Sequence, residues 1–291
     1  MVKRQFIAFA AALGLAARLP GFARTGGRQA AGQPAKWAMR ALLLDLRRRG
    51  LKRFSAFYPT STRGRCCGIH VQRSSRRIPT WSWSARTAIA GVQRVSRARF
   101  TTPPRQARVL LGNEGEAAPL VRNVEALDAS RRLPVSSRVG VSGGNLPALA
   151  GDAPQRVDLR VVQAFSFEGR SDPRSLAVLA RARRFFGLRD LHELPANGGY
   201  EHAYDLTHLL ARALKLAGRP DRAAVRAVPQ RVRDYDGLLG RFARPFSAAS
   251  HEALSPAHAF MGRLSAAGTV VPLATGPRTP RVDGAGMVQP W

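Results

Sequence analysis

The stretch "RVLLGNEGEAAPLVRNVEAL", residues 108–127, shows most clearly how this 291-residue chain folds. It opens with a short apolar run, Val109–Leu111, and continues with a turn of glycine, asparagine and glutamate. After the turn, apolar residues recur at helical spacing on one face: Leu120, Val121, Val124 and Leu127. This change from a continuous apolar run to a period of 3.6 residues predicts a buried strand followed by an amphipathic helix.

The start of that helix carries two conflicting signals. Asn113 and Glu116 stand at the spacing of a capping box, in which each side chain hydrogen-bonds to the backbone of the other residue. Pro119 follows, and proline is favoured at the first helical position but removes a hydrogen bond inside a helix. We therefore expect regular helix to begin near Ala118, with Pro119 as its first residue.

Strands and helices alternate on both sides of this stretch. Upstream, residues 36–50 have the apolar spacing of a helix, and residues 52–59 form an extended apolar run that ends at a proline. Downstream, residues 132–141 and 157–167 are predicted strands. This alternation predicts a parallel sheet covered by helices on both faces, with the strands near residues 109, 135 and 160 side by side.

The next predicted helix, residues 173–186, has clear boundary signals. Asp172 is a suitable N-cap, a proline follows at the first helical position, and Gly187 ends the helix. We expect its buried face to carry three apolar residues: Leu176, Leu179 and Phe186. After a further helix, the chain is predicted to end its ordered part in a strand pair within residues 260–273.

The helix predicted over residues 201–217 begins with four potential metal or acid–base groups: Glu201, His202, Asp205 and His208. At about 100° per residue, these side chains point in different directions and cannot converge on one ion. The acids suit the positive end of the helix dipole. We expect a packing helix whose buried stripe is apolar, formed by Ala203, Leu206, Leu210, Ala213, Leu214 and Ala217.

No enzyme motif is recognisable elsewhere in the chain. The glycine-rich loop "GVSGGN", residues 140–145, lacks the Gly-Lys-Ser/Thr of a P-loop and the GxSxG spacing of a nucleophile elbow. It does follow a predicted parallel strand, which is where open α/β sheets bind ligands. We therefore expect no catalytic residues, no metal site and no cofactor, and do not expect an enzyme. The loop is either a plain surface turn or a ligand-binding loop.

The net charge of +29 raises a different possibility, a secreted basic protein that binds nucleic acid or anionic surfaces non-specifically. The charge is concentrated in residues 46–113, which hold sixteen basic side chains and no acid. Only four of the 47 basic residues are lysines, whereas phosphate-binding proteins commonly use both lysine and arginine. This composition is more typical of a GC-rich gene, and we expect no specific nucleic-acid partner.

The two ends of the chain differ from the middle. Residues 1–23 combine a basic start, an apolar run too short to span a bilayer, and small residues before position 24, as in a secretory signal peptide. Residues 24–35 are a predicted linker, and residues 274–291 are a predicted disordered tail rich in proline and glycine. The mature chain is expected to be exported and to contain no membrane-spanning helix.

Residues 66–106 have neither a helical nor a strand period and contain no acid, so we expect this section to be irregular. Its adjacent Cys66 and Cys67 lack the spacing of metal ligands or of a disulfide framework, and we interpret them as incidental. We hypothesise a shifted reading frame over this section. Translating the gene in the other two frames tests the hypothesis, which fails if neither frame gives an amphipathic α/β pattern.

Several stretches, taken in order, resemble solute-binding proteins of ABC transporters, of the branched-chain-amino-acid-binding type: "LLGNEGEAAPLVR", "GVSGGNLPALAGD", "VDLRVVQAFSF", "HAYDLTHLLARALKLAG", "YDGLLGRF" and "FMGRLSAAGTVVPL". The resemblance covers residues 36–65 and 108–273. It implies an α/β, type I periplasmic-binding fold with a parallel sheet flanked by helices and an incomplete first lobe. Residues 36–167 would form the second lobe, and residues 168–273 a remnant of the first lobe with the hinge return.

The resemblance also implies a function and a site. The protein would be a monomeric periplasmic component that delivers a small solute, an amino acid or a related compound, to an ABC permease in the inner membrane. Its ligand contacts would be Ser142, Gly143 and Asn145 in the cleft loop, with Tyr200 at the cleft edge. Amino-acid binders of this type can carry an acid in that loop to hold the ligand ammonium, and residues 138–145 contain none.

Overall fold

A computed structural model describes most of the middle of the chain. The described residues are 35–59, 82–89, 106–143, 145–190, 193–194, 199–218, 228–248, 253–255 and 258–273. The predicted signal peptide and C-terminal tail lie outside them, as do nearly all of the predicted linker and both cysteines. No helix within the described ranges is long and apolar enough to cross a membrane.

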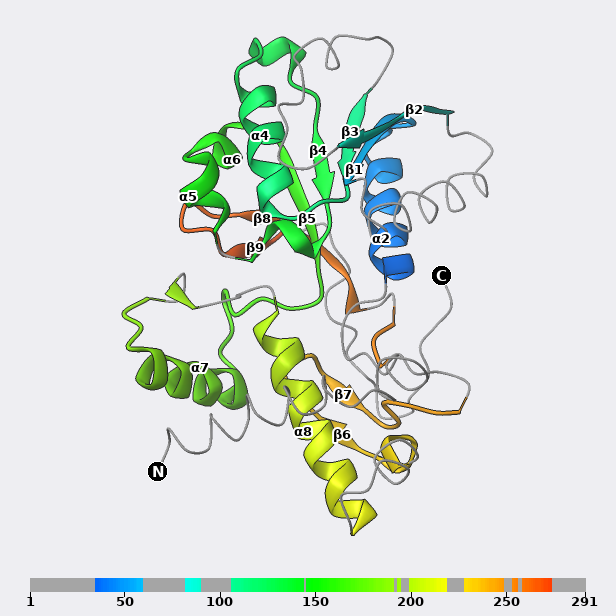
Figure 1. Cartoon of the computed structure of the whole chain (residues 1–291), viewed down its shortest axis with the longest axis vertical. Helices are drawn as coiled ribbons and strands as arrows, with labels where there is room; N and C mark the ends of the chain where they lie inside the picture. Colours follow the sequence, from blue (N-terminus) through cyan, green and yellow to red (C-terminus); the bar gives the residue numbers. More distant parts are fainter. Residues whose placement is uncertain are drawn as a thin grey trace. The chain divides into compact units, whose positions relative to one another are not determined.

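The described residues form a seven-stranded sheet in the order β2-β1-β3-β4-β5-β8-β9 (Figure 1). Strands β1 to β5 run parallel, while β8 pairs antiparallel with β5 and β9 antiparallel with β8. The strand bounds are β1 Arg53–Pro59, β2 Ser82–Ile89, β3 Ala107–Leu110, β4 Val135–Ser137, β5 Leu159–Gln163, β8 Phe260–Leu264 and β9 Val270–Pro272. The predicted parallel sheet, its three neighbouring middle strands and the closing strand pair are therefore confirmed.

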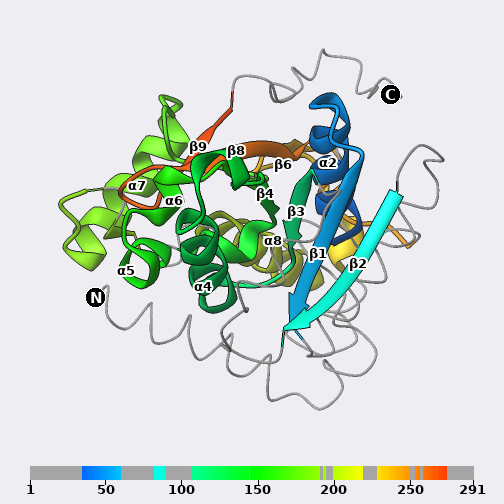
Figure 2. The same cartoon turned by 90° about the horizontal axis from the view of Figure 1, so that it is seen from above.

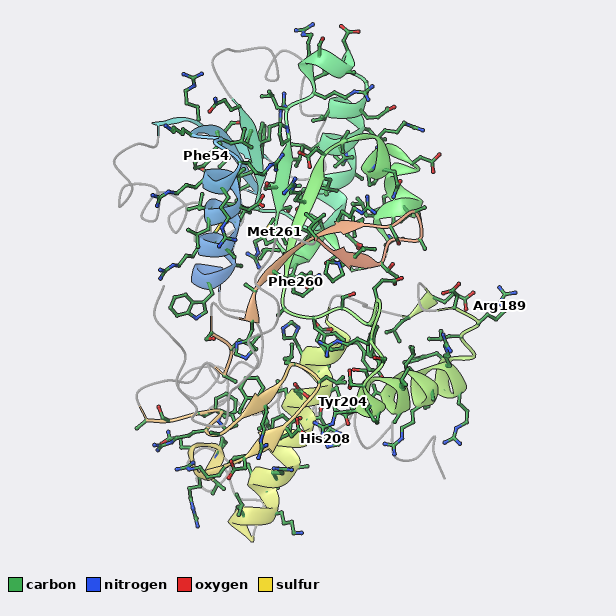
Figure 3. The ribbon with its side chains drawn as sticks, turned by 180° about the vertical axis from the view of Figure 1, so that it is seen from behind. Phe54, Arg189, Tyr204, His208, Phe260 and Met261 are labelled. Atoms are coloured by element: carbon green, nitrogen blue, oxygen red, sulfur yellow. The ribbon has the colours of Figure 1, made fainter. Side chains whose placement is uncertain are left out.

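Helices cover both faces of this sheet because successive strand residues point to opposite sides. On one face, α2 (Ala35–Arg48) packs its leucines and methionine on β1 and β3. The other face packs on α4 (Glu114–Glu125), α5 (Leu146–Ala150) and α6 (Ala153–Arg156). The alternation is visible on β8 (Figure 3). Met261 packs with Ala38 of α2 on one face of the sheet. Its neighbour Phe260 packs against the core on the opposite face, where α4, α5 and α6 lie.

One strand lies inside the section that we expected to be irregular. Strand β2, within residues 66–106, pairs parallel with β1 along its full length and forms the edge of the sheet (Figure 2). The expectation of no regular structure there was wrong for these eight residues. An edge strand needs only backbone pairing on one side, so it can form without the apolar alternation that a sequence search relies on.

Helix α4 begins earlier than predicted. Its first residue is Glu114, so Pro119 lies inside the helix and not at its start. The capping box of Asn113 and Glu116 is confirmed, and the Glu116 carboxylate accepts the Asn113 N–H at 2.8 Å. The box therefore decides where the helix starts, because it satisfies backbone donors that the helix would otherwise leave free.

Helix α7 (Pro173–Phe186) has the predicted ends but a different buried face. Asp172 accepts the Ser175 N–H at 2.9 Å, and Gly187 adopts the left-handed conformation that ends the helix. Burial opposes ionisation of Asp172, but hydrogen bonds from Ser175 and the charge of Arg170 outweigh it and lower the pKa of this carboxyl. The buried residues are Ser175, Val178 and Ala182, whereas Leu176 and Phe186 are exposed.

Helix α8 (Tyr200–Ala217) also differs from the predicted packing. Its fully buried residues recur every fourth position: Glu201, Asp205, Leu209 and Ala213. Of the stripe that we expected to be buried, only Ala213 is fully buried, and Ala203 and Leu206 are exposed. The two acids therefore belong to the packed face, which the amphipathic pattern did not indicate.

The described residues fall into two compact units, and residues 206–236 and 241–253 contribute to the smaller one. Within it, β6 (Tyr235–Asp236) and β7 (Arg241–Phe242) form a short antiparallel pair, and the rings of Tyr235 and Phe242 stack at 6.5 Å. The guanidinium of Arg212 lies over the Tyr235 ring. Three short 3-10 helices complete the described elements: η3 (Ala129–Arg131), η4 (Val139–Val141) and η6 (Val228–Arg231).

Candidate functional site

The order of the parallel strands indicates which loops can bind a ligand. Strands β2 and β1 lie on one side of the point where the order reverses, and β3, β4 and β5 lie on the other. In open α/β sheets, ligands bind outside the carboxyl ends of the strands near this reversal. The reversal lies between β1 and β3, and the described loop beside it follows β3 at Leu111–Asn113. The loop after β4, which begins at residue 138, lies next to that loop because β4 pairs with β3.

These two loops are pressed together at Gly140. A Cβ placed on Gly140 would lie 2.6 Å from Oδ1 of Asn113 and 2.8 Å from the carbonyl oxygen of Gly112. Both distances are shorter than real Cβ contacts, so only glycine allows the loop after β4 to approach the loop after β3 this closely. Nearby, Ser137 Oγ donates to the Leu110 carbonyl at 2.7 Å and joins the ends of the two strands.

We expect Gly140→Ala to destabilise the protein, by roughly 1–3 kcal/mol, because the added methyl group meets backbone atoms that cannot move independently. Gly115→Ala is the matched control, since a Cβ there meets nothing within 4 Å. It should be neutral or slightly stabilising, because alanine is favoured over glycine in a helix. Urea unfolding of both variants measures the difference. Equal stability of the two would contradict the close approach of the loops.

An acidic side chain from the first turn of α4 lies against the predicted ligand loop. A Cβ on Gly143 would lie 3.1–3.2 Å from the carboxylate atoms of Glu114, and Glu114 Oε1 accepts the Asn145 N–H at 2.8 Å. Both Gly143 and Asn145 are exposed. The loop itself contains no acid, but Glu114, at the start of the helix that follows the neighbouring strand β3, supplies one.

Ser142 has a structural position. It is 1% exposed, its Oγ donates to the Val139 carbonyl at 2.7 Å, and it accepts a hydrogen bond from Nε2 of Gln163 at the end of β5. Gln163 is fully buried, and its Oε1 has no hydrogen-bond partner among the described residues. Ser142 therefore links the ends of β4 and β5.

Tyr200 is half-buried at the start of α8. Its ring lies 6.1 Å from that of Phe167, which follows β5 and packs edge-on against Phe165 at 4.8 Å. Burial, with a smaller contribution from Tyr204, raises the pKa of Tyr200 above its usual value. Its phenol is therefore protonated at neutral pH and can donate a hydrogen bond.

The four polar groups at the start of α8 do not all converge on one point, although His202 contacts Glu201. Glu201 and Asp205 are buried, whereas His208 is exposed. His202 Nδ1 lies 3.1 Å from Glu201 Oε1. Within the described part of the chain, no three histidine, cysteine or acidic side chains are grouped as a metal ion would require.

Sequence reasoning missed three residues of this region: Asn113, Glu114 and Gln163. The sequence pattern places Asn113 and Glu114 only at a helix start, and Gln163 only in a strand. A signal was present for Asn113 and Glu114, because they follow the predicted strand Val109–Leu111. Gln163 lies inside the predicted strand 157–167, so no boundary signal marked it. The carboxyl ends of neighbouring parallel strands share one edge of the sheet.

Comparison with protein-family models and with curated proteins finds no match to this chain. Solved structures do match. A leucine-binding protein from Thermotoga maritima has a TM-score of 0.67 at 15% identity, over 82% of this chain and 65% of its own. A type 1 periplasmic binding protein from Bordetella pertussis has a TM-score of 0.67 at 17% identity, over 83% of this chain and 66% of its own.

A third match is an ABC-transporter solute-binding protein from R. palustris in complex with benzoate. Its TM-score is 0.65 at 16% identity, over 84% of this chain and 63% of its own. This chain thus spans a little under two thirds of the length of these structures. The strand order, the helices on both faces and these matches together show that the chain has the α/β fold of type I periplasmic binding proteins.

Proposed function

We propose that the protein is the solute-binding component of an ABC importer and binds a small solute at the loops after β3 and β4. The fold supports this proposal, since solved structures of the same fold include a leucine-binding protein and a benzoate complex. We also propose that it is exported to the periplasm as a monomer, with a permease as its membrane partner. The domain assignment from the sequence, with an incomplete first lobe, stays part of this proposal.

The position of Glu114 is the observation that carries the proposal. Its carboxylate faces exposed Gly143 and accepts a hydrogen bond from the Asn145 N–H. A carboxylate has lone pairs for about four hydrogen bonds, so Glu114 can still accept donors from a ligand. An ammonium group is the natural donor, because charge-assisted hydrogen bonds are the strong ones. We therefore favour an amino acid as the solute.

The predicted contact residues have different parts in this proposal. Gly143 and Asn145 line the exposed loop and would contact the solute directly. Ser142, which is buried and already bonded to Gln163, would position the loop and not bind the ligand itself. Tyr200 would donate its phenol hydrogen bond from the edge of the site.

We expect L-leucine to bind and 4-methylpentanoate, which lacks the amino group, to bind roughly tenfold more weakly, because a charged hydrogen bond contributes about 1.5–3 kcal/mol. Glu114→Gln should remove this preference and lower only the affinity for leucine. Glu168→Gln is the matched control, since Glu168 is exposed after β5. Isothermal titration calorimetry measures the affinity of each protein for each ligand. Equal affinities of the wild type for the two ligands would refute the role of Glu114.

The alternative function, binding of nucleic acid by the basic section, is less well supported by the structure. Two arginines of that section that the structure describes have structural partners. Arg108 is 2% exposed and donates to the Leu133 carbonyl at 3.3 Å. Arg49 pairs with Asp45 and Asp158. Filter binding of DNA at increasing salt separates the two functions, because phosphate contacts give a steep salt dependence.

A further inference from the structure

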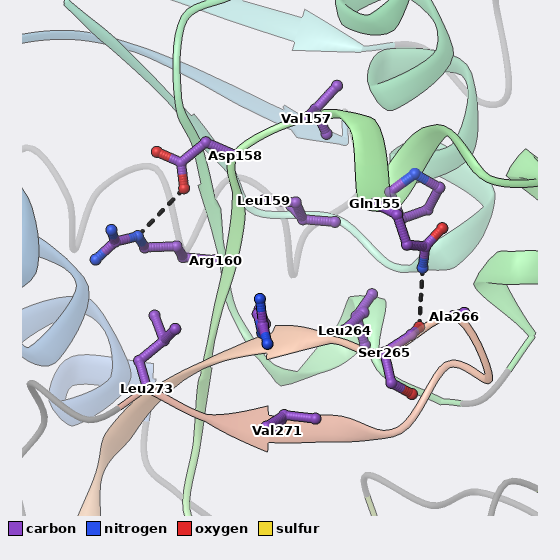
Figure 4. A pocket seen from close by; sticks show the side chains of 12 residues that line it. Gln155, Val157, Asp158, Leu159, Arg160, Leu264, Ser265, Ala266, Val271 and Leu273 are labelled. Carbon is purple, nitrogen blue, oxygen red and sulfur yellow. Dashed lines mark hydrogen bonds and ion pairs between the residues drawn. The ribbon is translucent and has the colours of Figure 1, made fainter.

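The described residues contain a pocket of about 490 Å³ at the start of β5 (Figure 4). Its walls are α6 with the residues leading into β5, the first part of β5, and the hairpin of β8 and β9. We propose that this pocket is a second ligand site, which binds a small carboxylate with an apolar body. Its volume is in the range of small-molecule sites.

The pocket is separate from the proposed solute site. Leu159 lines it at the first position of β5, whereas Gln163, bonded to Ser142, ends the same strand. Four steps along a strand span roughly 13 Å. The proposal therefore does not depend on the function of the loops after β3 and β4.

The pocket carries one uncompensated positive charge. Asp158 bonds to Arg160 at 3.2 Å and to Arg49, and Arg160 also bonds to Asp45 at 3.1 Å. These two acids and two arginines neutralise one another. Arg263, on β8, is exposed and has no hydrogen-bond or ion-pair partner among the described residues. Its guanidinium fork matches a carboxylate, which it can bind through two parallel hydrogen bonds.

The surroundings of Arg263 are apolar. In the strand register it lies directly opposite Val271, so the two side chains stand on the same face as close neighbours. Leu273 and Leu264 also line the pocket, with Val157 on the α6 side. A strongly hydrated anion such as phosphate would lose its water against these groups without replacement. A carboxylate attached to an apolar group could pair with the Arg263 guanidinium and pack against the leucine and valine side chains of the lining.

The walls are held by hydrogen bonds. Gln155 Nε2 donates to the Ser265 carbonyl at 2.8 Å and fixes the residues before β5 to the hairpin. Within the hairpin, the hydroxyls of Ser265 and Thr269 bond at 2.7 Å, and the Ser265 N–H donates to the Thr269 carbonyl at 2.8 Å. A preformed site loses little conformational freedom when it binds.

Calorimetric titration of the full chain with benzoate, its uncharged analogue benzamide, and inorganic phosphate tests the proposal. We expect benzoate to bind, and benzamide and phosphate to bind roughly tenfold more weakly or worse. Arg263→Gln should weaken benzoate binding by about tenfold, and Arg263→Lys, which keeps the charge but loses the fork, should give an intermediate affinity. Arg241→Gln, another exposed strand arginine, is the matched control and should bind benzoate normally.

The proposal would be overturned by normal benzoate binding in Arg263→Gln, by equal binding of benzoate and benzamide, or by equal weakening in Arg241→Gln. Loss of benzoate binding in Glu114→Gln would also overturn it, because benzoate would then occupy the loops after β3 and β4. The exposure of Arg263 means that its substitution should leave the thermal unfolding curve unchanged. If leucine does not bind at the loops after β3 and β4, the expected binding of benzoate at the second site is unchanged.

Discussion

Asp205→Ala is expected to lower the free energy of unfolding by about 3 kcal/mol or more, because it leaves two buried donors without an acceptor. The carboxylate is 1% exposed and accepts the N–H of Leu238 at 2.8 Å and of Leu239 at 2.9 Å. Both leucines are buried, so water cannot replace the lost acceptor. Urea denaturation gives the change directly.

Two further variants make the Asp205 result specific. Asp205→Asn should cost nearly as much, since each carboxylate oxygen accepts one of the two N–H groups and an amide nitrogen cannot accept. Glu168→Ala removes an exposed acid and should change stability by less than about 0.5 kcal/mol. If Asp205→Ala is as stable as Glu168→Ala, the turn at residues 237–240 is not held by this carboxylate.

Glu201→Met is expected to have the opposite effect and to raise the free energy of unfolding by about 1–3 kcal/mol, which is the order of the cost of burying a polar group without enough hydrogen bonds. Glu201 is fully buried, and neither carboxylate oxygen has a hydrogen-bond partner within the described ranges apart from its contact with the neighbouring His202. A buried carboxylate with a single neighbouring histidine as its contact loses more hydrogen bonds to water than it regains, and methionine fills a similar volume without that cost. The two acids of α8, four residues apart, should therefore respond in opposite directions.

Glu201→Gln separates charge from shape in this experiment. The amide removes the charge but still needs hydrogen bonds, so its stability should lie between those of the wild type and the methionine variant. Thermal and urea unfolding of the three proteins, at one pH, gives the order. A destabilised methionine variant would show that the Glu201 carboxylate has an essential partner, and that its burial is not a cost to the fold.

Apart from β2, the strands of the sheet could be predicted because their signals are local. The run Val109–Leu111, the turn at Asn113 and the apolar face after it are each readable within one window, and the strands near residues 135 and 160 repeat the pattern. Capping signals also located the ends of α7, at Asp172 and Gly187. Such features depend on backbone chemistry that neighbouring residues determine.

The buried faces of α7 and α8 could not be predicted in the same way. An amphipathic pattern identifies which side chains are apolar, but burial depends on what packs against the helix. Leu176 is 50% exposed although it lies on the predicted face of α7. Asp205 is buried because a turn more than thirty residues later donates hydrogen bonds to it. The sequence close to α8 does not show that these distant donors will bury Asp205.

The candidate site was only partly predictable for a related reason. The loop with Gly143 and Asn145 was found from its glycines and its position after a strand. Glu114 is distant from that loop in sequence, and only the parallel pairing of β3 with β4 brings the two together. Residues 138–145 contain no acid that could hold a ligand ammonium, and Glu114, at the start of α4, places one beside this loop.

An amide-resolved NMR titration of the full chain with L-leucine tests the proposed solute site most directly. We predict that the largest chemical-shift changes occur at residues 112–116 and 140–146, in the loops after β3 and β4, and that they vanish in Glu114→Gln. Shift changes confined to other parts of the chain, or the same changes in Glu114→Gln as in the wild type, would contradict the account.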